Sequence, residues 1–271
     1  MAQSFEYFVI FAEMRTGSNF LEENVNSYPG LKCWGEVFNP AFIGKSGQKE
    51  MLGVTMLARE ARPTVLLDKM RQETKGLSGF RFFHDHDPRI LTHVLNDPKC
   101  AKIILTRNPL ESYVSRKIAS VTGQWRLGAL KHAKSAKVTF NRREIQKMLY
   151  ELKAFQIFLQ RQLQMTGQTA FYINYADIQD VEVLNGLARF LGVTQERNKT
   201  TQKTKVQNPS RLEDKVLNYA EMVSDLSSID HFNLSDTPNF EPRRKPAVPT
   251  YVASVKTPVL YMPVRGGPEA S

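Results

Sequence analysis

The sequence is poor in cysteine. Only Cys33 and Cys100 occur in 271 residues, which is too few for a disulfide framework. Neither cysteine lies in a CxxC pair or a zinc-knuckle pattern. These absences argue against a disulfide-stapled secreted domain and against a cysteine-rich zinc module. We therefore expect a cytoplasmic protein.

Long hydrophobic runs are also lacking. No stretch approaches the roughly 20 apolar residues that a membrane helix needs. The apolar run from Tyr7 to Ala12 is short and is bracketed by Glu6 and Glu13, so we expect no signal peptide. Any contact with a membrane surface should therefore be peripheral.

Acidic residues are outnumbered. The chain has 37 Lys and Arg against 27 Asp and Glu, a formal charge of +10, which draws anionic ligands, acidic polymers or anionic membrane surfaces. Between Arg126 and Lys147 the only acid is Glu144, a pattern typical of a solvated basic helix face. The hydrophobic fraction of 41% is ordinary for a folded protein, so global disorder is not expected.

Apolar runs of strand length alternate with segments of helical periodicity. We expect strands at 5–12, 79–83, 101–106 and 169–175, and helices at 18–25, 54–60, 66–73, 110–119, 142–165 and 181–191. This alternation predicts an α/β fold, a P-loop-like three-layer α/β/α sandwich with a central parallel sheet.

The last part of the chain differs in composition. Seven of the 14 prolines fall between Pro238 and Pro268, which excludes a long helix there. We therefore expect an α/β domain at 1–235 and a proline-rich extension at 236–271. The extension should pack in extended form on the body or on a neighbouring subunit.

The loop after the first strand contains Arg15, Thr16, Gly17, Ser18 and Asn19. A glycine lets the backbone approach a phosphate, and the following helix aims free N–H groups at it. Hydroxyls and a guanidinium add further donors. The loop lacks the lysine and first glycine of G-x-x-x-x-G-K-[ST], which argues against magnesium-triphosphate chemistry. Alone, the pattern would fit a plain strand-to-helix turn.

A second polar segment follows the strand at 101–106. Arg107 ends that strand, Asn108 is a typical N-cap and Pro109 suits the first helical position. Ser115 falls on the same helical stripe as Asn108, so it can lie beside the site that Arg107 faces. Together they predict a second phosphate pocket; alone, Arg107 could be a surface cation.

These two segments together resemble the sulfotransferase superfamily that uses 3′-phosphoadenosine 5′-phosphosulfate (PAPS). The resemblance implies that residues 15–19 hold the donor's 5′-phosphosulfate and that Arg107 and Ser115 hold its 3′-phosphate. The R-[ST]-G-S form resembles the bacterial branch that sulfates carbohydrates and lipids. Similarity extends over roughly residues 5 to 225. It implies that Lys205 and Arg211 cover the nucleotide.

The resemblance also assigns the chemistry. In the bacterial branch the base is a glutamate shortly after the first helix, and Glu36 matches that position. The resemblance therefore implies that Glu36 is the base and that Arg15 stabilises the leaving phosphate. His86, and less so His84, competes as base at the end of the strand at 79–83, with Asp85 or Asp87 to orient it. No metal is demanded, and two histidines supply only part of a coordination shell.

The acceptor stays open: a hydroxyl or amine of a glycan, glycolipid, lipid or small metabolite. We expect no nucleic-acid partner, and a homodimer is compatible with the sequence. One rival is a nucleotide-dependent, kinase-like enzyme on the same fold, which needs the missing lysine. A second is a non-enzymatic basic module that binds nucleic acid or anionic membrane, which explains the charge but not the two phosphate loops. For the aromatic residues Phe38, Phe42 and Trp125 three roles are open: lining an acceptor groove, stacking on adenine or, as the default, packing in the core.

Overall fold

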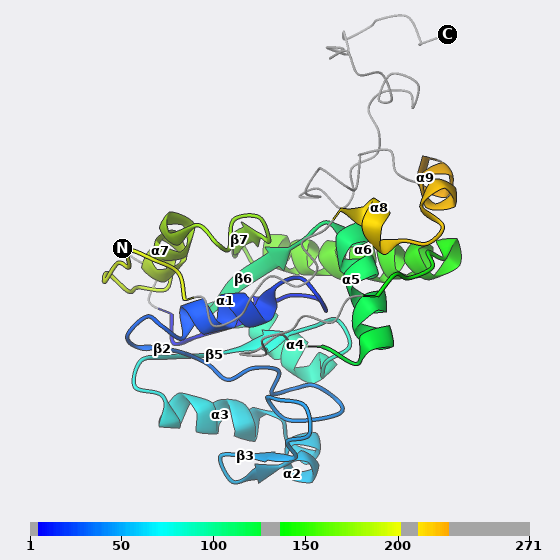
Figure 1. Ribbon diagram of the computed structural model, residues 1–271. Coiled ribbons are helices and arrows are strands. Elements are labelled where there is room, and N and C mark those ends of the chain that lie inside the picture. Colours follow the sequence, from blue (N-terminus) through cyan, green and yellow to red (C-terminus); the bar gives the residue numbers. More distant parts are fainter. Residues whose placement is uncertain (1–4, 126–135, 202–210, 228–271) are drawn as a thin grey trace, which may run out of the picture.

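The computed structural model describes residues 5–125, 136–201 and 211–227. They form three layers, with a parallel sheet in the middle and helices on both of its faces (Figure 1). In spatial order its strands are β2 (Leu31–Cys33), β5 (Leu77–Phe82), β1 (Tyr7–Phe11), β6 (Cys100–Thr106) and β7 (Phe171–Asn174). Every neighbouring pair is parallel. This architecture confirms the predicted α/β fold with a central parallel sheet.

The central strand β1 is buried on both faces. Tyr7, Val9 and Phe11 point into one core, whereas Phe8 and Ile10 point into the other, as the two-residue period of a strand requires. The continuous apolar run of β1 therefore reflects a sheet covered by helices on both sides.

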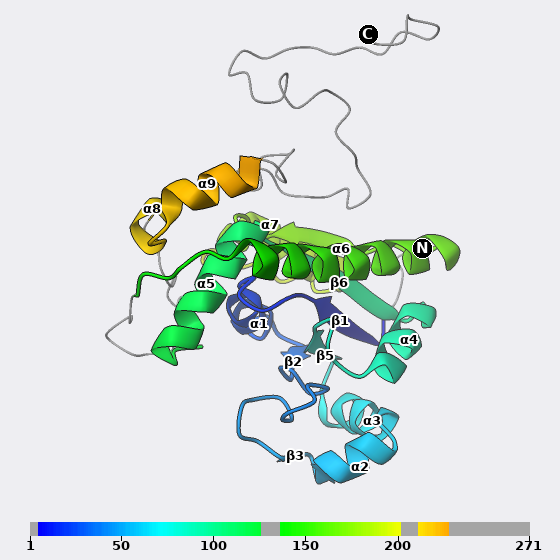
Figure 2. The same cartoon turned by 90° about the vertical axis from the view of Figure 1, so that its right-hand side faces the viewer.

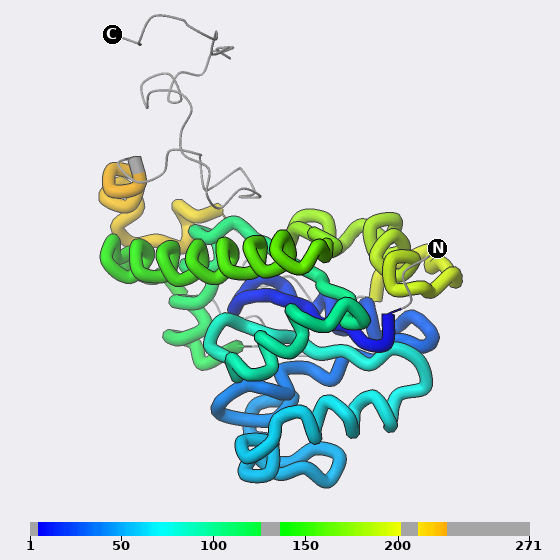
Figure 3. The backbone as a smooth tube through the Cα atoms, turned by 180° about the vertical axis from the view of Figure 1, so that it is seen from behind, coloured from blue at the N-terminus to red at the C-terminus, as the bar shows by residue number. Residues whose placement is uncertain are grey.

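Two sets of helices cover the sheet. The first core receives side chains from α3 (Thr64–Glu73), α4 (Pro88–Asn96) and α6 (Arg142–Met165). The second receives them from α1 (Ser18–Val25) and α7 (Val181–Phe190). Figure 2 shows α1 and α4 on opposite sides of β1. Figure 3, which views the molecule from behind, shows the long helix α6 running across it.

A smaller apolar cluster lies beside the sheet. It joins α5 (Pro109–Thr122) and α6 to α8 (Leu212–Lys215) and α9 (Tyr219–Ser227). Asn108 caps α5 as predicted, because its side chain accepts from the N–H groups of Leu110 and Glu111. The start of α5 is therefore set by its own sequence.

The helix expected at 54–60 begins later than predicted. A short hairpin of β3 (Glu50–Met51) and β4 (Val54–Thr55) precedes it, and both residues of its turn, Leu52 and Gly53, have positive φ. Thr55 ends β4 and caps α2 (Met56–Ala61) by accepting from the Ala58 N–H. The sequence analysis also missed α4, although Asp87 and Pro88 provide its N-cap and first residue.

The predicted extension at 236–271, with its boundary, lies outside the described residues and stays a prediction. Among the helices that the structure describes, none is both long and apolar enough to cross a membrane.

The first prediction concerns the packing of β5 against β1. A Cβ at Gly79 would lie 2.2 Å from Cε2 of Phe8. We predict that Gly79→Ala lowers the free energy of unfolding by about 1–3 kcal/mol, because a ring in a close-packed core cannot move freely. Chemical denaturation measures this change.

The matched control is Gly186→Ala in α7, where the nearest neighbouring atoms lie 4.0 Å from the new Cβ. Alanine is favoured over glycine inside a helix by roughly 0.5–1 kcal/mol, so this variant should be at least as stable as the parent. Equal unfolding free energies for the two variants would contradict the close packing of Gly79.

Candidate active site

A cavity of about 470 Å³ opens at the carboxyl ends of the strands. Because β1 pairs with β5 on one side and β6 on the other, the loops after these strands meet at the point where the strand order reverses. Six of the residues predicted for the site line this cavity: Arg15, Gly17, Ser18, Asn19, Glu36 and Arg107. The topology therefore joins segments far apart in the sequence.

The loop between β1 and α1 requires glycine at position 17. Gly17 has φ of +89°, and a Cβ there would lie 2.6 Å from Cδ2 of Tyr175 and 2.8 Å from Cδ1 of Ile178. Arg15 has φ of +68°, a left-handed conformation that is strained for a residue with a side chain. The loop thus holds a tight shape against the residue that follows β7.

The beginning of α1 faces the same cavity. Among the described residues no side chain caps this helix end, and its first turn contains no acid. Its free N–H groups are therefore suited to an anion. Thr16 is used differently, because its buried hydroxyl donates to the Glu13 carbonyl at 2.7 Å and so braces the loop.

Two arginines converge beside the loop. Arg107 donates to the backbone carbonyl of Arg15 at 2.7 Å, and its guanidinium lies 3.9 Å from the centre of the Tyr175 ring. Glu111 accepts from both Nε and Nη2 of Arg107. Arg107 is thereby held against the loop by backbone, carboxylate and aromatic contacts.

Arg15 reaches across to the helix that follows Arg107. Its Nε donates to Oγ of Ser115 at 3.0 Å, and its Nη1 donates to the Trp125 carbonyl at 2.7 Å. Burial, and then the neighbouring charge of Arg107, lower the pKa of Arg15. Two guanidinium groups at one edge of a partly buried cavity favour a bound anion.

Glu36 lies on the other side of the cavity, in the loop after β2. Its backbone exchanges two hydrogen bonds with Gly44, each 3.1 Å long. The carboxylate forms an ion pair with Arg81 at 3.2 Å and accepts from Nδ2 of Asn39 at 3.0 Å. The side chain is 15% exposed, so it is largely buried yet borders the cavity.

These contacts set the ionisation of Glu36. Burial alone would raise the pKa of its carboxyl group, but the contacts with His86 and Arg81 outweigh burial and hold the pKa below its ordinary value. Glu36 is therefore a carboxylate at neutral pH, able to accept a proton.

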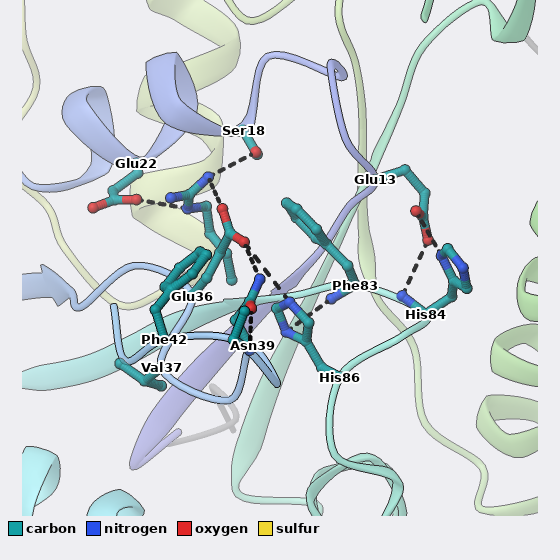
Figure 4. A network of polar contacts seen from close by, with 12 residues as sticks. Glu13, Ser18, Glu22, Glu36, Val37, Asn39, Phe42, Phe83, His84 and His86 are labelled. Carbon is teal, nitrogen blue, oxygen red and sulfur yellow. Dashed lines mark hydrogen bonds and ion pairs between the residues drawn. The ribbon is translucent and has the colours of Figure 1, made fainter. Parts of the chain in front are cut away.

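The two candidate histidines lie apart rather than on one strand face, because β5 already ends at Phe82 (Figure 4). His84 pairs with Glu13 at 2.8 Å, whereas Nε2 of His86 lies 3.8 Å from Oε2 of Glu36. The partners of the histidines are therefore glutamates, not Asp85 or Asp87. Asp87 instead caps α4 and pairs with Arg89.

His86 has no access to the cavity. Its side chain is 0% exposed, its ring stacks on Phe83, and its Nδ1 accepts from the Phe83 N–H at 3.3 Å. In the neutral ring the proton is then on Nε2, which faces Glu36. The geometry makes His86 a support for Glu36 and leaves Glu36 in reach of a ligand.

The structure describes only one of the two residues expected to cover the nucleotide. Lys205 lies outside the described residues. Arg211 is exposed, pairs with Glu213 at 3.2 Å and does not border the cavity. Within the ranges that the structure describes, no group of three or more His, Cys, Asp or Glu is arranged to hold a metal ion.

Arg81 and Tyr175 also line the cavity, although neither was predicted as a site residue. Two sequence signals could have indicated them as site residues: Arg81 is a charged residue within the buried strand β5, and Tyr175 directly follows β7. Phe42 and Trp125 border the cavity rather than the core, whereas Phe38 is a core residue as expected by default.

No protein-family model and no curated protein matches the chain. Among solved structures the chain is similar to a sulfotransferase from Alicyclobacillus acidocaldarius, with 17% sequence identity and a TM-score of 0.46. The alignment covers 84% of this chain and 96% of that chain. At this distance, any function has to be argued from the residues of the site.

The second prediction concerns the pair of His84 and Glu13. The hydrogen bond and charge of Glu13 raise the pKa of His84, so Glu13→Gln should lower that pKa. An NMR titration of the His84 ring signals measures it, with the exposed His93 on α4 as internal control. An identical His84 titration in both proteins would contradict the pairing.

The same pair gives a pH dependence of stability. Because the folded-state pKa is raised, the stabilisation by Glu13 is fully present below the unfolded pKa of His and is lost as pH rises through the folded pKa. The difference in unfolding free energy between parent and Glu13→Gln should therefore shrink toward alkaline pH.

Proposed function

We propose that the protein is a PAPS-dependent sulfotransferase that moves a sulfuryl group from 3′-phosphoadenosine 5′-phosphosulfate to a hydroxyl or amine. The observation that carries this proposal is the convergence, in one cavity, of Arg15 and Arg107 with the carboxylate of Glu36. Ser115, which accepts a hydrogen bond from Arg15, lies next to this pair of cations. One side of the cavity suits a polyanion, and the other suits a proton acceptor.

The donor has two anionic ends, and the cluster offers cations and hydroxyls to both. The N–H groups at the beginning of α1 and the hydroxyl of Ser18 suit the 5′-phosphosulfate. Arg107 and Ser115 suit the 3′-phosphate, and the Tyr175 ring offers an apolar face nearby. Arg15 belongs to the loop that precedes α1, and its side chain contacts Ser115, so we assign it to the leaving phosphate.

The reaction balances without an added reagent. The acceptor oxygen attacks sulfur, Glu36 takes the acceptor's proton, and the bond between sulfur and the 5′-phosphate oxygen breaks. The electron pair of that bond leaves with 3′-phosphoadenosine 5′-phosphate (PAP). The permanent charge of Arg15 stabilises the negative charge that grows on the departing phosphate.

Glu36 is preferred over His86 as the base because of access. Glu36 borders the cavity, whereas the His86 ring is fully buried and its Nε2 faces Glu36 at 3.8 Å. A base must lie within hydrogen-bond reach of the proton that it removes. His86 then orients the carboxylate and lowers its pKa.

The acceptor is proposed as a class only: a glycan, glycolipid, lipid or small metabolite. The cavity that Glu36 borders is also lined by the aromatic residues Phe42 and Trp125 and by the polar residues Asn39 and Lys45. Apolar walls with a few polar groups are common in sites that take small organic molecules.

The third prediction tests the donor site. Titration calorimetry without metal should show that PAP binds more tightly than adenosine 5′-phosphate. Arg107→Ala should weaken PAP binding about 10- to 100-fold, because a hydrogen bond to a charged group is worth roughly 1.5–3 kcal/mol. The variant should also lose the preference for the 3′-phosphate.

Arg189→Ala is the matched control, because this exposed arginine of α7 pairs with Glu196 away from the cavity and its loss changes the net charge equally. Failure of the parent protein to bind PAP would sink the proposed function. Saturable binding of magnesium-ATP without a 3′-phosphate preference would favour the kinase-like rival. Salt-dependent polyanion binding that PAP does not affect would favour the basic module.

The fourth prediction tests the base. Glu36→Gln should retain PAP affinity but lose about 10²- to 10⁴-fold in sulfuryl transfer, the usual contribution of a general base. Transfer from ³⁵S-labelled donor to a panel of glycans, lipids and small metabolites measures it. Unchanged transfer would remove Glu36 from the mechanism.

A further inference from the structure

A buried arginine, Arg81, contacts both Glu36 and the loop at residues 15–19, which is called the donor loop below because the proposed function assigns it to the sulfuryl donor. Arg81 is the next-to-last residue of β5, between Phe80 and Phe82, and its side chain is only 6% exposed. A charge in this apolar layer is costly unless it is paired and hydrogen-bonded. The groups that pair with the Arg81 guanidinium therefore indicate its role.

The guanidinium of Arg81 joins two separate parts of the cavity wall. Nη1 donates to Oγ of Ser18 at 3.0 Å and forms an ion pair with Glu36 at 3.2 Å. Nε forms an ion pair with Glu22 of α1 at 2.6 Å. Figure 4 shows Ser18, Glu22 and Glu36 as members of one network of polar contacts.

The contact with Ser18 fixes the direction of a hydroxyl proton. Because the Ser18 oxygen accepts from Arg81, its own O–H is directed away from the guanidinium. Ser18 borders the cavity at the beginning of α1. Arg81 thus prepares Ser18 as a donor to an anion in the loop.

The contact with Glu36 is shared with a second carboxylate. Glu22 and Glu36 are 14% and 15% exposed, and both pair with the one guanidinium. The charged or titratable groups around Glu36 come from four other elements and its own loop: Arg81 of β5, His86 after β5, Glu22 of α1, Arg59 of α2 and Lys45. Arg81 contacts both Glu36 and Ser18 at the beginning of α1.

We infer that Arg81 is a positioning residue that sets both reacting sides at once: the Ser18 hydroxyl toward the sulfuryl group and the Glu36 carboxylate toward the acceptor. This role rests on the proposed sulfotransferase function. In this role Arg81 acts through its contacts with Ser18 and Glu36. The geometry explains why a buried strand carries a cation at this position.

The first test needs neither donor nor acceptor. Carbon-13 NMR titration of labelled glutamate carboxyls, with Glu36→Gln to assign the signal, follows the ionisation of Glu36. Arg81→Met should raise the pKa of Glu36, because the carboxylate loses a cation while burial remains. Glu22→Gln should lower it, because Arg81 then pairs with Glu36 alone.

The opposite signs separate this role from general damage to the fold. Arg81→Lys keeps the charge but cannot reach Ser18, Glu22 and Glu36 with one planar fork, so it should fall between the parent and Arg81→Met. If Arg81→Met does not fold, Arg81→Lys and Glu22→Gln still decide the question. An unchanged Glu36 titration in both would overturn the inference.

Transfer kinetics provide the second test. In Arg81→Met the Kd for PAP, which lacks the sulfuryl group, should change less than about threefold, whereas kcat for ³⁵S transfer should fall about 10- to 100-fold. The acid limb of the kcat profile should move to higher pH. If the parent protein does not bind PAP, the proposed function is wrong. If the parent binds PAP and Arg81→Met leaves kcat and its pH profile unaltered, only this inference is overturned.

Discussion

The pairing of β1 with strands on both of its sides organises the rest of the structure. Tyr7–Phe11 is hydrogen-bonded to β5 on one edge and to β6 on the other, and both neighbours run parallel to it. Parallel strands end at the same edge, so the loops after all three open into one cavity. The apolar side chains of β1, buried on both faces, maintain this arrangement.

Close packing then shapes the loop after β1. The Tyr175 ring and the Ile178 side chain occupy the space where a Cβ of residue 17 would be, so glycine is required for both conformation and space. The same ring supports the guanidinium of Arg107. Aromatic packing therefore positions the cations, and the bound anion proposed for this cavity would offset their mutual repulsion.

Burial separates the two candidate bases. Glu36 and His86 are partners, but the imidazole is enclosed by Phe82 and Phe83 whereas the carboxylate borders the cavity. Arg81 connects the carboxylate with Ser18 of the donor loop. Glu36 and Ser18 thus share one buried charged network rather than two independent supports.

The amino-acid sequence by itself determined the elements whose signals are local: the apolar run of β1, the bounds of α1 and α6, and the Asn108 cap of α5. It also predicted phosphate sites at residues 15–19 and at Arg107 and Ser115, because glycine, hydroxyl and arginine are residue types that bind phosphate. Local signals misplaced the start of α2, where the turn at Leu52 and Gly53 made a hairpin first. Tertiary structure alone decided which histidine meets Glu36, that Tyr175 packs on the donor loop and that Arg81 joins the two sides of the cavity. These contacts bring together residues from separate strands and loops, and their burial and distances exist only once the sheet has brought its carboxyl ends together.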